Sequence, residues 1–225
     1  MAVYVGPERK AFHLHRDLLC DRSAYFKAAF TGSSKEADAK ELVLPDGDSL
    51  AFELFVNWQY GSLLTGPSND GELQTYFALL ALGEKLMLEY LSNQCTDLIR
   101  GYYRSTNALV RAQDVSYIYR NIKRQAMRYC IVKLTVLQTL EEKEKGFLPG
   151  FRELIAGGGD FAADFSCYLL KYAVLKDRPA LGHPTNPQFN CRYHSHDLTP
   201  KCKGPAVYSI QPIDEWERRR REHFS

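Results

Sequence analysis

The sequence predicts an α+β fold in which a small sheet comes first and helices make up most of the remaining chain. Three short β-type runs lie within the first 44 residues, at 2–5, 10–14 and 41–44. From Asp48 onward, apolar residues recur at the three- and four-residue spacing of helices instead of alternating. After Asp177 six prolines interrupt both patterns as far as Glu215, so we expect the end of the chain to be an irregular tail.

Turn and cap residues delimit the first elements. Gly6-Pro7 separates the first two strands, and Pro45-Asp46-Gly47 stops the third. One short helical turn is expected at 17–20, and Ser23 is then the expected N-cap of a second helix. The helix from Asp48 is expected to end at Gly61 and to bury one aromatic face made of Phe52, Phe55, Val56 and Tyr60.

The later helices follow the same apolar spacing. They are expected at 72–87, 89–100, 115–122, 124–140, 151–156 and 161–174. Gly83 lies inside the first of these, where it would allow close packing of a neighbouring helix. The run Gly157-Gly158-Gly159 follows a helix rather than a strand, which favours a helix stop over a phosphate cradle.

Composition and charge exclude several classes of protein. A chain of 225 residues, 45% hydrophobic and 25% charged, is long enough for one large domain or a domain with an extension. A net charge of +2 disfavours a protein that coats a polyanion with its whole surface. We find no bilayer-spanning run and no signal peptide. Six cysteines are too few for a disulfide scaffold in a chain of this length, which favours the cytoplasm or the nucleus.

Four ordered motifs occupy residues 3 to 103. They are Phe12-His13-Leu14-His15-Arg16-Asp17-Leu18-Leu19, then Ser23-x-Tyr25-Phe26-x-x-x-Phe30, then Leu42-x-Leu44-Pro45-Asp46 with Phe52-x-x-Phe55-Val56-x-Trp58-x-Tyr60-Gly61, and finally Leu80-Ala81-Leu82-Gly83-Glu84-Lys85-Leu86 with Leu91-x-Asn93. Together they resemble the BTB/POZ domain family, and the chain looks most like the stand-alone BTB proteins common in fungi. The resemblance implies a BTB/POZ domain at 1–104, with a small three-stranded sheet flanked by helical hairpins. A helical extension at 105–178 and a Pro-rich Cys/His tail with a basic C-terminus at 179–225 would follow.

The resemblance also implies a function. BTB/POZ domains are non-catalytic protein–protein interaction modules, and some are substrate adaptors of cullin-type ubiquitin ligases. The region resembling the family's cullin-contacting face is the loop 31–40 with the hairpin 72–100, so the candidate partner-binding residues are Ser34, Lys35, Glu36 and Tyr76. Ser34 stands where cullin-binding members often carry a hydrophobic residue. The helix and strand that many members exchange on dimerising have no counterpart before Val3, so we expect a monomer or weak self-association.

No constellation for catalysis is found. The sequence has no Gly-x-Gly-x-x-Gly, no Gly-x-x-x-x-Gly-Lys-Ser/Thr, no Gly-x-Ser-x-Gly and no His-Glu-x-x-His pattern. His15 opens a helix and has no nucleophile or metal ligand beside it in the sequence, so a structural role is expected. We therefore expect a protein that is not an enzyme.

One ligand constellation lies in the Pro-rich tail, Cys191-x-x-His194-x-His196-x5-Cys202. Zinc prefers four cysteine and histidine ligands in a tetrahedron, and a segment with little helix potential gains most from such a clip. A structural zinc ion at Cys191, His194, His196 and Cys202 is therefore one hypothesis. The alternatives are a tail that packs on the helices without a metal, and a Cys191–Cys202 disulfide, which a reducing compartment disfavours.

The last feature is the basic run Arg218-Arg219-Arg220-Arg221. It supports an alternative function, a nuclear transcription or chromatin regulator that assembles through its BTB domain and uses the basic Cys/His tail on nucleic acid. Glu215, Glu217 and Glu222 dilute the charge, and no aromatic platform accompanies it. A solvated terminal helix is the simpler interpretation, so nucleic acid is the less favoured partner.

Overall fold

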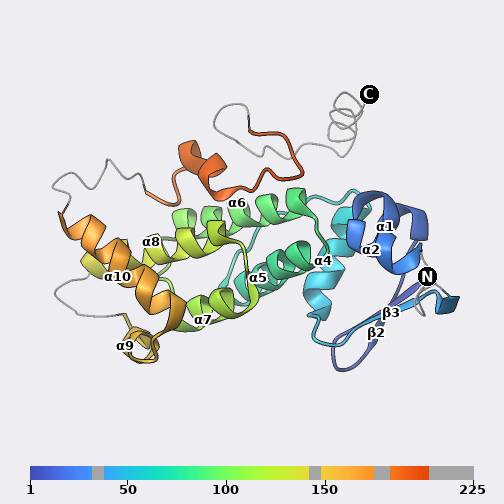
Figure 1. Cartoon of the computed structure of the whole chain (residues 1–225), viewed down its shortest axis with the longest axis horizontal. Coiled ribbons are helices and arrows are strands. Elements are labelled where there is room, and N and C mark those ends of the chain that lie inside the picture. The colour runs from blue at the N-terminus through green and yellow to red at the C-terminus, as the bar shows by residue number, and fades with distance from the viewer. Residues whose placement is uncertain (32–37, 142–147, 175–182, 203–225) are drawn as a thin grey trace. The chain divides into compact units, whose positions relative to one another are not determined.

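A computed structural model describes residues 1–31, 38–141, 148–174 and 183–202 (Figure 1). Within these residues the chain forms two compact units: unit 1 contains 1–65 and 85–88, and unit 2 contains 66–84 and 89–202. The elements of unit 1 are β1 (Ala2–Val5), β2 (Lys10–His13), α1 (Arg16–Arg22), α2 (Ala24–Phe30), β3 (Glu41–Leu44) and α4 (Ser49–Gln59). Those of unit 2 are α5 (Asp70–Lys85), which ends at its border, α6 (Glu89–Thr106), α7 (Ala112–Asn121), α8 (Gln125–Glu141), α9 (Phe151–Ala156), α10 (Gly159–Val174) and the 3-10 helix η2 (Pro187–Tyr193).

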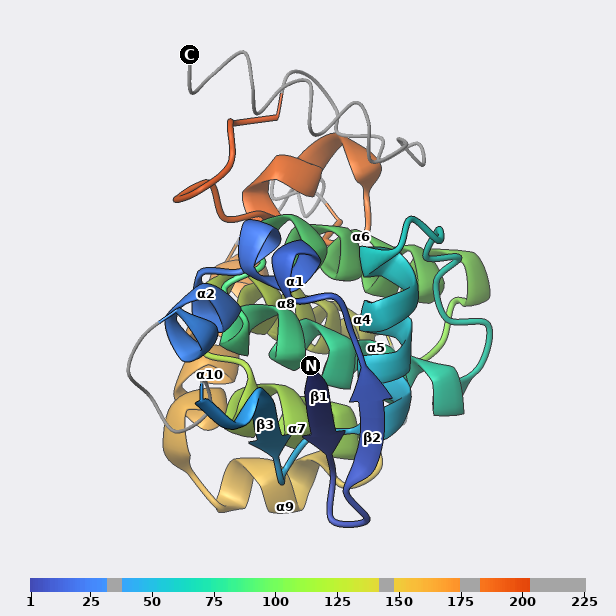
Figure 2. The same ribbon diagram turned by 90° about the vertical axis from the view of Figure 1, so that its right-hand side faces the viewer.

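The three predicted strands form one sheet with the order β2-β1-β3, and β1 lies in the middle (Figure 2). β1 pairs antiparallel with β2, where Ala2 faces His13, and parallel with β3, where Ala2 faces Glu41. β3 buries Leu42 and Leu44 and exposes Glu41 and Val43, as expected for a half-buried strand. The α+β class and its small three-stranded sheet are thereby confirmed.

The expected N-cap Ser23 is present, and Asp48, where the next helix was expected to begin, is the N-cap of α4. The Ser23 hydroxyl accepts a hydrogen bond from the Phe26 amide at 3.2 Å and donates one to the Leu86 carbonyl at 2.7 Å. The Asp48 carboxylate accepts from the Ala51 amide at 2.8 Å. These bonds satisfy amides that would otherwise lack a partner at the helix starts, which is why both helices begin there.

The aromatic face of α4 differs from the expectation at its end. Phe52 and Phe55 are fully buried, but Val56 is half-buried and Tyr60 is 48% exposed. The helix ends at Gln59, so Tyr60 leaves the buried stripe, and Gly61 follows with a φ of 97°. The Tyr60 hydroxyl instead lies 2.7 Å from Nδ1 of His15, the residue that precedes α1. This contact gives His15 a structural partner.

Unit 2 contains the later helices, and several of them are longer than expected. α10 begins at Gly159, and α6 continues to Thr106, past the expected domain boundary at residue 104. α5 has its expected length but begins and ends two residues earlier, at Asp70 and Lys85. The helices before and after residue 104 lie in the same compact unit. The division of the chain into domains at 1–104 and 105–178 therefore stays a prediction. Gly83 packs closely on α6, because a Cβ at Gly83 would lie 2.8 Å from Oγ of Ser92.

The described part of the tail also contains one regular element. Residues 187–193 form the 3-10 helix η2, where the prolines predicted irregular structure. Asn186 caps η2 by accepting from the Gln188 amide at 3.0 Å, and Pro187 occupies its first turn, where the missing amide hydrogen costs nothing. η2 packs on α6 and α8, as Figure 1 shows. Among the described residues, no helix is both long and apolar enough to cross a membrane.

Candidate metal centre

The four predicted metal ligands lie close together in unit 2. Cys191 belongs to η2, His194 caps its C-terminus, and His196 and Cys202 follow in a segment without regular secondary structure. His196 Nε2 lies 3.4 Å from Cys191 Sγ and 3.8 Å from Cys202 Sγ, and ligand atoms of these three residues all lie within 4.8 Å of one another. His194 Nδ1 lies 3.3 Å from Cys202 Sγ, at the edge of this group.

For Cys191, His196 and Cys202 these separations match a tetrahedral metal site, whereas His194 has no nitrogen within 4.8 Å of all three of those ligand atoms. With Zn–S bonds of about 2.3 Å and Zn–N bonds of about 2.0 Å, a thiolate sulfur and an imidazole nitrogen lie about 3.5 Å apart. Three of the four sulfur–nitrogen distances at this site, 3.3, 3.4 and 3.8 Å, bracket that value. Two thiolates would also neutralise the charge of a divalent ion. A site that takes all four ligands from the protein leaves no position for substrate, so its chemistry is structural rather than catalytic.

The second nitrogen of His196 faces a polar chain that ends on α6. Its Nδ1 lies 3.4 Å from Oγ1 of Thr199, and that hydroxyl donates to Oε1 of Glu89 at 2.5 Å. Because the hydroxyl hydrogen is used by Glu89, the Thr199 oxygen is left to accept from Nδ1–H of His196. This arrangement favours the tautomer in which Nε2, the nitrogen between the two sulfurs, carries the free lone pair.

His194 has the mirrored arrangement. Its side chain is fully buried, and its Nε2 lies 3.0 Å from Oδ1 of Asp97 on α6, at an ion-pair distance but without the alignment of a hydrogen bond. The carboxylate favours a proton on Nε2, so Nδ1 offers its lone pair toward Cys202. Histidine ligands in metal sites ordinarily direct their other nitrogen to a carboxylate, a carbonyl or a water in this way.

A polar stripe of α6 binds the backbone of the tail. We call it the α6 stripe; its members are Glu89, Asn93, Asp97 and Arg100, which lie one helical turn apart. Glu89 accepts from the amides of Asp197, Leu198 and Thr199 at 3.1, 2.9 and 3.1 Å. The Asn93 side chain donates to the carbonyl and accepts from the amide of Ser195, at 2.9 and 3.0 Å.

Arg100 extends the α6 stripe to the start of the tail. Its guanidinium donates to the Pro184 and Asn186 carbonyls at 2.7 and 3.0 Å and lies 4.4 Å above the Tyr193 ring. Glu89, Asn93 and Arg100 are all buried. Buried polar side chains need partners, and the tail backbone supplies them. The sequence interpretation missed this stripe, although its regular polar spacing on a helix with apolar neighbours was a readable signal.

The other cysteines are not part of the centre. Cys95 and Cys130 are buried in α6 and α8, where burial raises the pKa of both thiols, that of Cys130 to about 11. Cys20 is half-buried in α1, and Cys167 is exposed on α10. All six cysteines are free thiols in this structure, and among the described residues only Cys191 and Cys202 lie beside histidines that could share a metal ion.

The predicted partner-binding residues are not brought together in the described part of the chain. Ser34, Lys35 and Glu36 lie outside the described residues, as does the basic run 218–221. Tyr76 was expected on a binding surface, but it is only 4% exposed, and its hydroxyl accepts from the Gly66 amide at 2.9 Å. The α5 stripe that contains Tyr76 is apolar and packs inward, so Tyr76 is a core residue rather than a contact residue.

Comparison with known proteins identifies the N-terminal part of the chain. The family profile described as the BTB/POZ domain matches residues 1–102. The human Kelch repeat and BTB domain-containing protein 6 is 28% identical over 122 residues, which cover 53% of this chain and 17% of that protein. The human Kelch repeat and BTB domain-containing protein 7 is 27% identical with the same coverage. The matched region is thus a small part of each relative.

Proposed function

We propose, from the premise that residues 1–102 of this chain form a BTB/POZ domain, that the protein is a substrate adaptor of a cullin-type ubiquitin ligase. The BTB/POZ match carries the coarser part of this function, which is non-catalytic protein–protein interaction. The sheet order β2-β1-β3 and the helices around it agree with that domain. In such an adaptor one surface binds the cullin scaffold and another recruits the substrate.

Two further features support the adaptor function. The matched relatives join a BTB domain to Kelch repeats, so in those proteins the domain is combined with a second module. In this chain, α7 to α10 and the tail lie beyond the matched residues 1–102. We assign cullin binding to the BTB/POZ domain and substrate recruitment to the helices that follow it.

The adaptor function is tested by titrating the purified full chain with the N-terminal region of cullin scaffolds from the same organism, with calorimetry as the readout. We expect a one-to-one complex. Glu36→Lys, in the loop predicted to contact the cullin, should weaken it at least tenfold, and Glu8→Lys, the same charge change at an exposed turn, should not. Binding to none of the cullins would exclude the adaptor function and leave only the interaction module.

We further propose that the chain is monomeric or self-associates weakly. β1 pairs on both sides with strands of its own chain, so its backbone needs no second copy. Light scattering over a dilution series at micromolar concentration measures this directly. A mass equal to a dimer at every dilution would contradict the proposal.

A further inference from the structure

We propose that Cys191, His194, His196 and Cys202 bind one Zn²⁺ ion, and that this ion holds residues 191–202 against the α6 stripe. The inference does not depend on the adaptor function, since it concerns how the tail is fixed to its own helix. Three of the ligands already have their donor atoms within 4.8 Å of one another. His194 Nδ1 lies 3.3 Å from Cys202 Sγ but outside that group, so His194 would have to move toward the other ligands to supply the fourth.

The choice of zinc follows from the ligand types. Two thiolates and two imidazoles in a tetrahedron suit zinc, whereas calcium and magnesium require oxygen ligands. The surroundings are also suited to a closed site. His194 is fully buried, and Cys191, His196 and Cys202 are half-buried, so solvent has limited access to the ligand atoms.

The coupling to α6 follows from the second nitrogen of each histidine. His194 reaches Asp97 directly, and His196 reaches Glu89 through Thr199. The two carboxylates lie two turns apart on one side of α6, so the ion and the helix would act on the same tail segment. A metal bound to these histidines would fix their tautomers and thereby strengthen both contacts.

Apart from its hydrogen bonds to the α6 stripe, segment 194–202 has little to fix its position. Residues 194–202 contain no regular secondary structure, and Leu198, the large apolar side chain of this segment, is 59% exposed. Segments that bury little apolar surface depend on cross-links or metals for their order. We therefore expect the hydrogen bonds from Glu89 to residues 197–199 to persist only while the ion is bound.

The experiment measures metal content and amide exchange on the full chain. Protein purified after expression in zinc-supplemented medium should contain one zinc ion per chain, as measured by elemental mass spectrometry. Cys191→Ser should lose most of that zinc, while the matched control Cys167→Ser, an exposed cysteine on α10, should keep it. Replacement of zinc by Co²⁺ should give thiolate-to-metal charge-transfer bands that weaken in His194→Ala.

A second measurement keeps the test valid if a variant fails to fold. In the wild-type chain, a chelator should accelerate hydrogen exchange at the amides of Asp197, Leu198 and Thr199 at least tenfold, and added zinc should restore their protection. No stoichiometric zinc, with Cys191 and Cys202 alkylated as fast as Cys167, would overturn the site. A Cys191–Cys202 disulfide would overturn it as well. Zinc that binds without changing exchange at residues 197–199 would overturn the coupling to α6.

Discussion

Oδ1 of Asp97 lies 3.0 Å from Nε2 of His194, and the same carboxylate oxygen lies 3.0 Å from the guanidinium of Arg100. One side chain on α6 therefore connects the candidate metal centre to the arginine that holds the start of the tail. The pair with Arg100 holds the carboxylate in place, and the contact with His194 aims Nδ1 of the imidazole toward Cys202. Figure 1 shows the described tail running along α6 over this region.

Asp97→Asn should weaken zinc binding about 10- to 100-fold, because a neutral amide orients the imidazole less well than a carboxylate does. Competition with a chromophoric chelator measures the affinity. Asp160→Asn serves as the control, since Asp160 is an exposed carboxylate that also pairs with an arginine, Arg128, at 3.4 Å. Equal zinc affinities for the two variants would show that Asp97 does not position His194.

Glu89→Gln should loosen the end of the described tail. The Glu89 carboxylate accepts three amide hydrogens and one hydroxyl hydrogen. The side-chain NH2 group of a glutamine is a donor, so it cannot accept from the N–H and O–H groups that it would face. We expect the free energy of unfolding to fall by about 1–3 kcal/mol, the cost of leaving buried polar groups unpaired. Denaturant unfolding and exchange at residues 197–199 measure it. Glu153→Gln on exposed α9 is the control, and an equal effect there would refute the role of Glu89.

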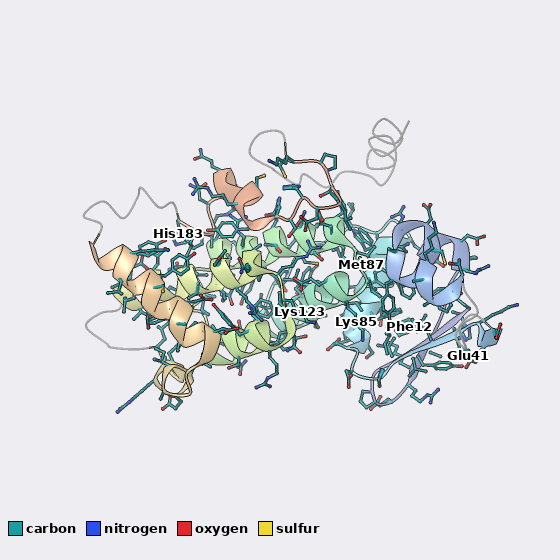
Figure 3. The ribbon with its side chains drawn as sticks, viewed as in Figure 1. Phe12, Glu41, Lys85, Met87, Lys123 and His183 are labelled. Atoms are coloured by element: carbon teal, nitrogen blue, oxygen red, sulfur yellow. The ribbon has the colours of Figure 1, made fainter. Side chains whose placement is uncertain are left out.

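Acidification should loosen the first turn of the described tail at His183, which is labelled in Figure 3. Burial lowers the pKa of His183 below 6.5, and the charge of Glu141 opposes this shift. Neutral Nδ1 accepts from the Thr185 amide at 3.3 Å, and protonation removes that lone pair. The folded state favours the neutral ring, so this stabilisation is present above pH 6.5 and is lost as the pH falls through the lowered pKa.

The Thr185 amide reports this change by hydrogen exchange, corrected for the intrinsic effect of pH on the exchange rate. Its protection should decrease as the pH falls below 6.5. His183→Asn offers an acceptor that does not titrate, so its protection should stay constant over the same range. A wild-type chain that behaves like His183→Asn would contradict the prediction.

Ser23→Ala should destabilise unit 1 by about 1–2 kcal/mol, because it removes an N-cap and leaves a buried amide and a buried carbonyl with fewer partners. Ser23 is only 2% exposed and bonds to Phe26 and Leu86. Thermal unfolding measures the change. Ser62→Ala, at an exposed position after α4, is the control and should unfold within experimental error of the unmodified chain. Indistinguishable transitions for all three proteins would rule out the double role of Ser23.

Local patterns were enough for much of the fold. The cap at Ser23, the start of a helix near Asp48 and the strand at 41–44 depend on neighbours within a few residues, so the sequence predicts them. Tyr60 and Tyr76 were assigned wrongly for the opposite reason. Both are aromatic residues on helical patterns. Tyr60 is exposed because α4 ends at Gln59, and Tyr76 is buried because its side of α5 packs inward. The BTB/POZ domain was recognisable because its motifs keep their order and spacing along the chain.

The candidate metal centre was also predictable from the sequence only in part. The sequence by itself determined the ligand types and their spacing, since Cys191, His194, His196 and Cys202 lie within one short segment. Only the tertiary structure decided what lies behind them. Asn93 and Ser195 are 102 positions apart, and Glu89 and Asp197 are 108 positions apart, so no local pattern links them. These pairs meet because α6 carries buried polar groups that need partners and the tail has unpaired backbone to offer, and folding brings the two together.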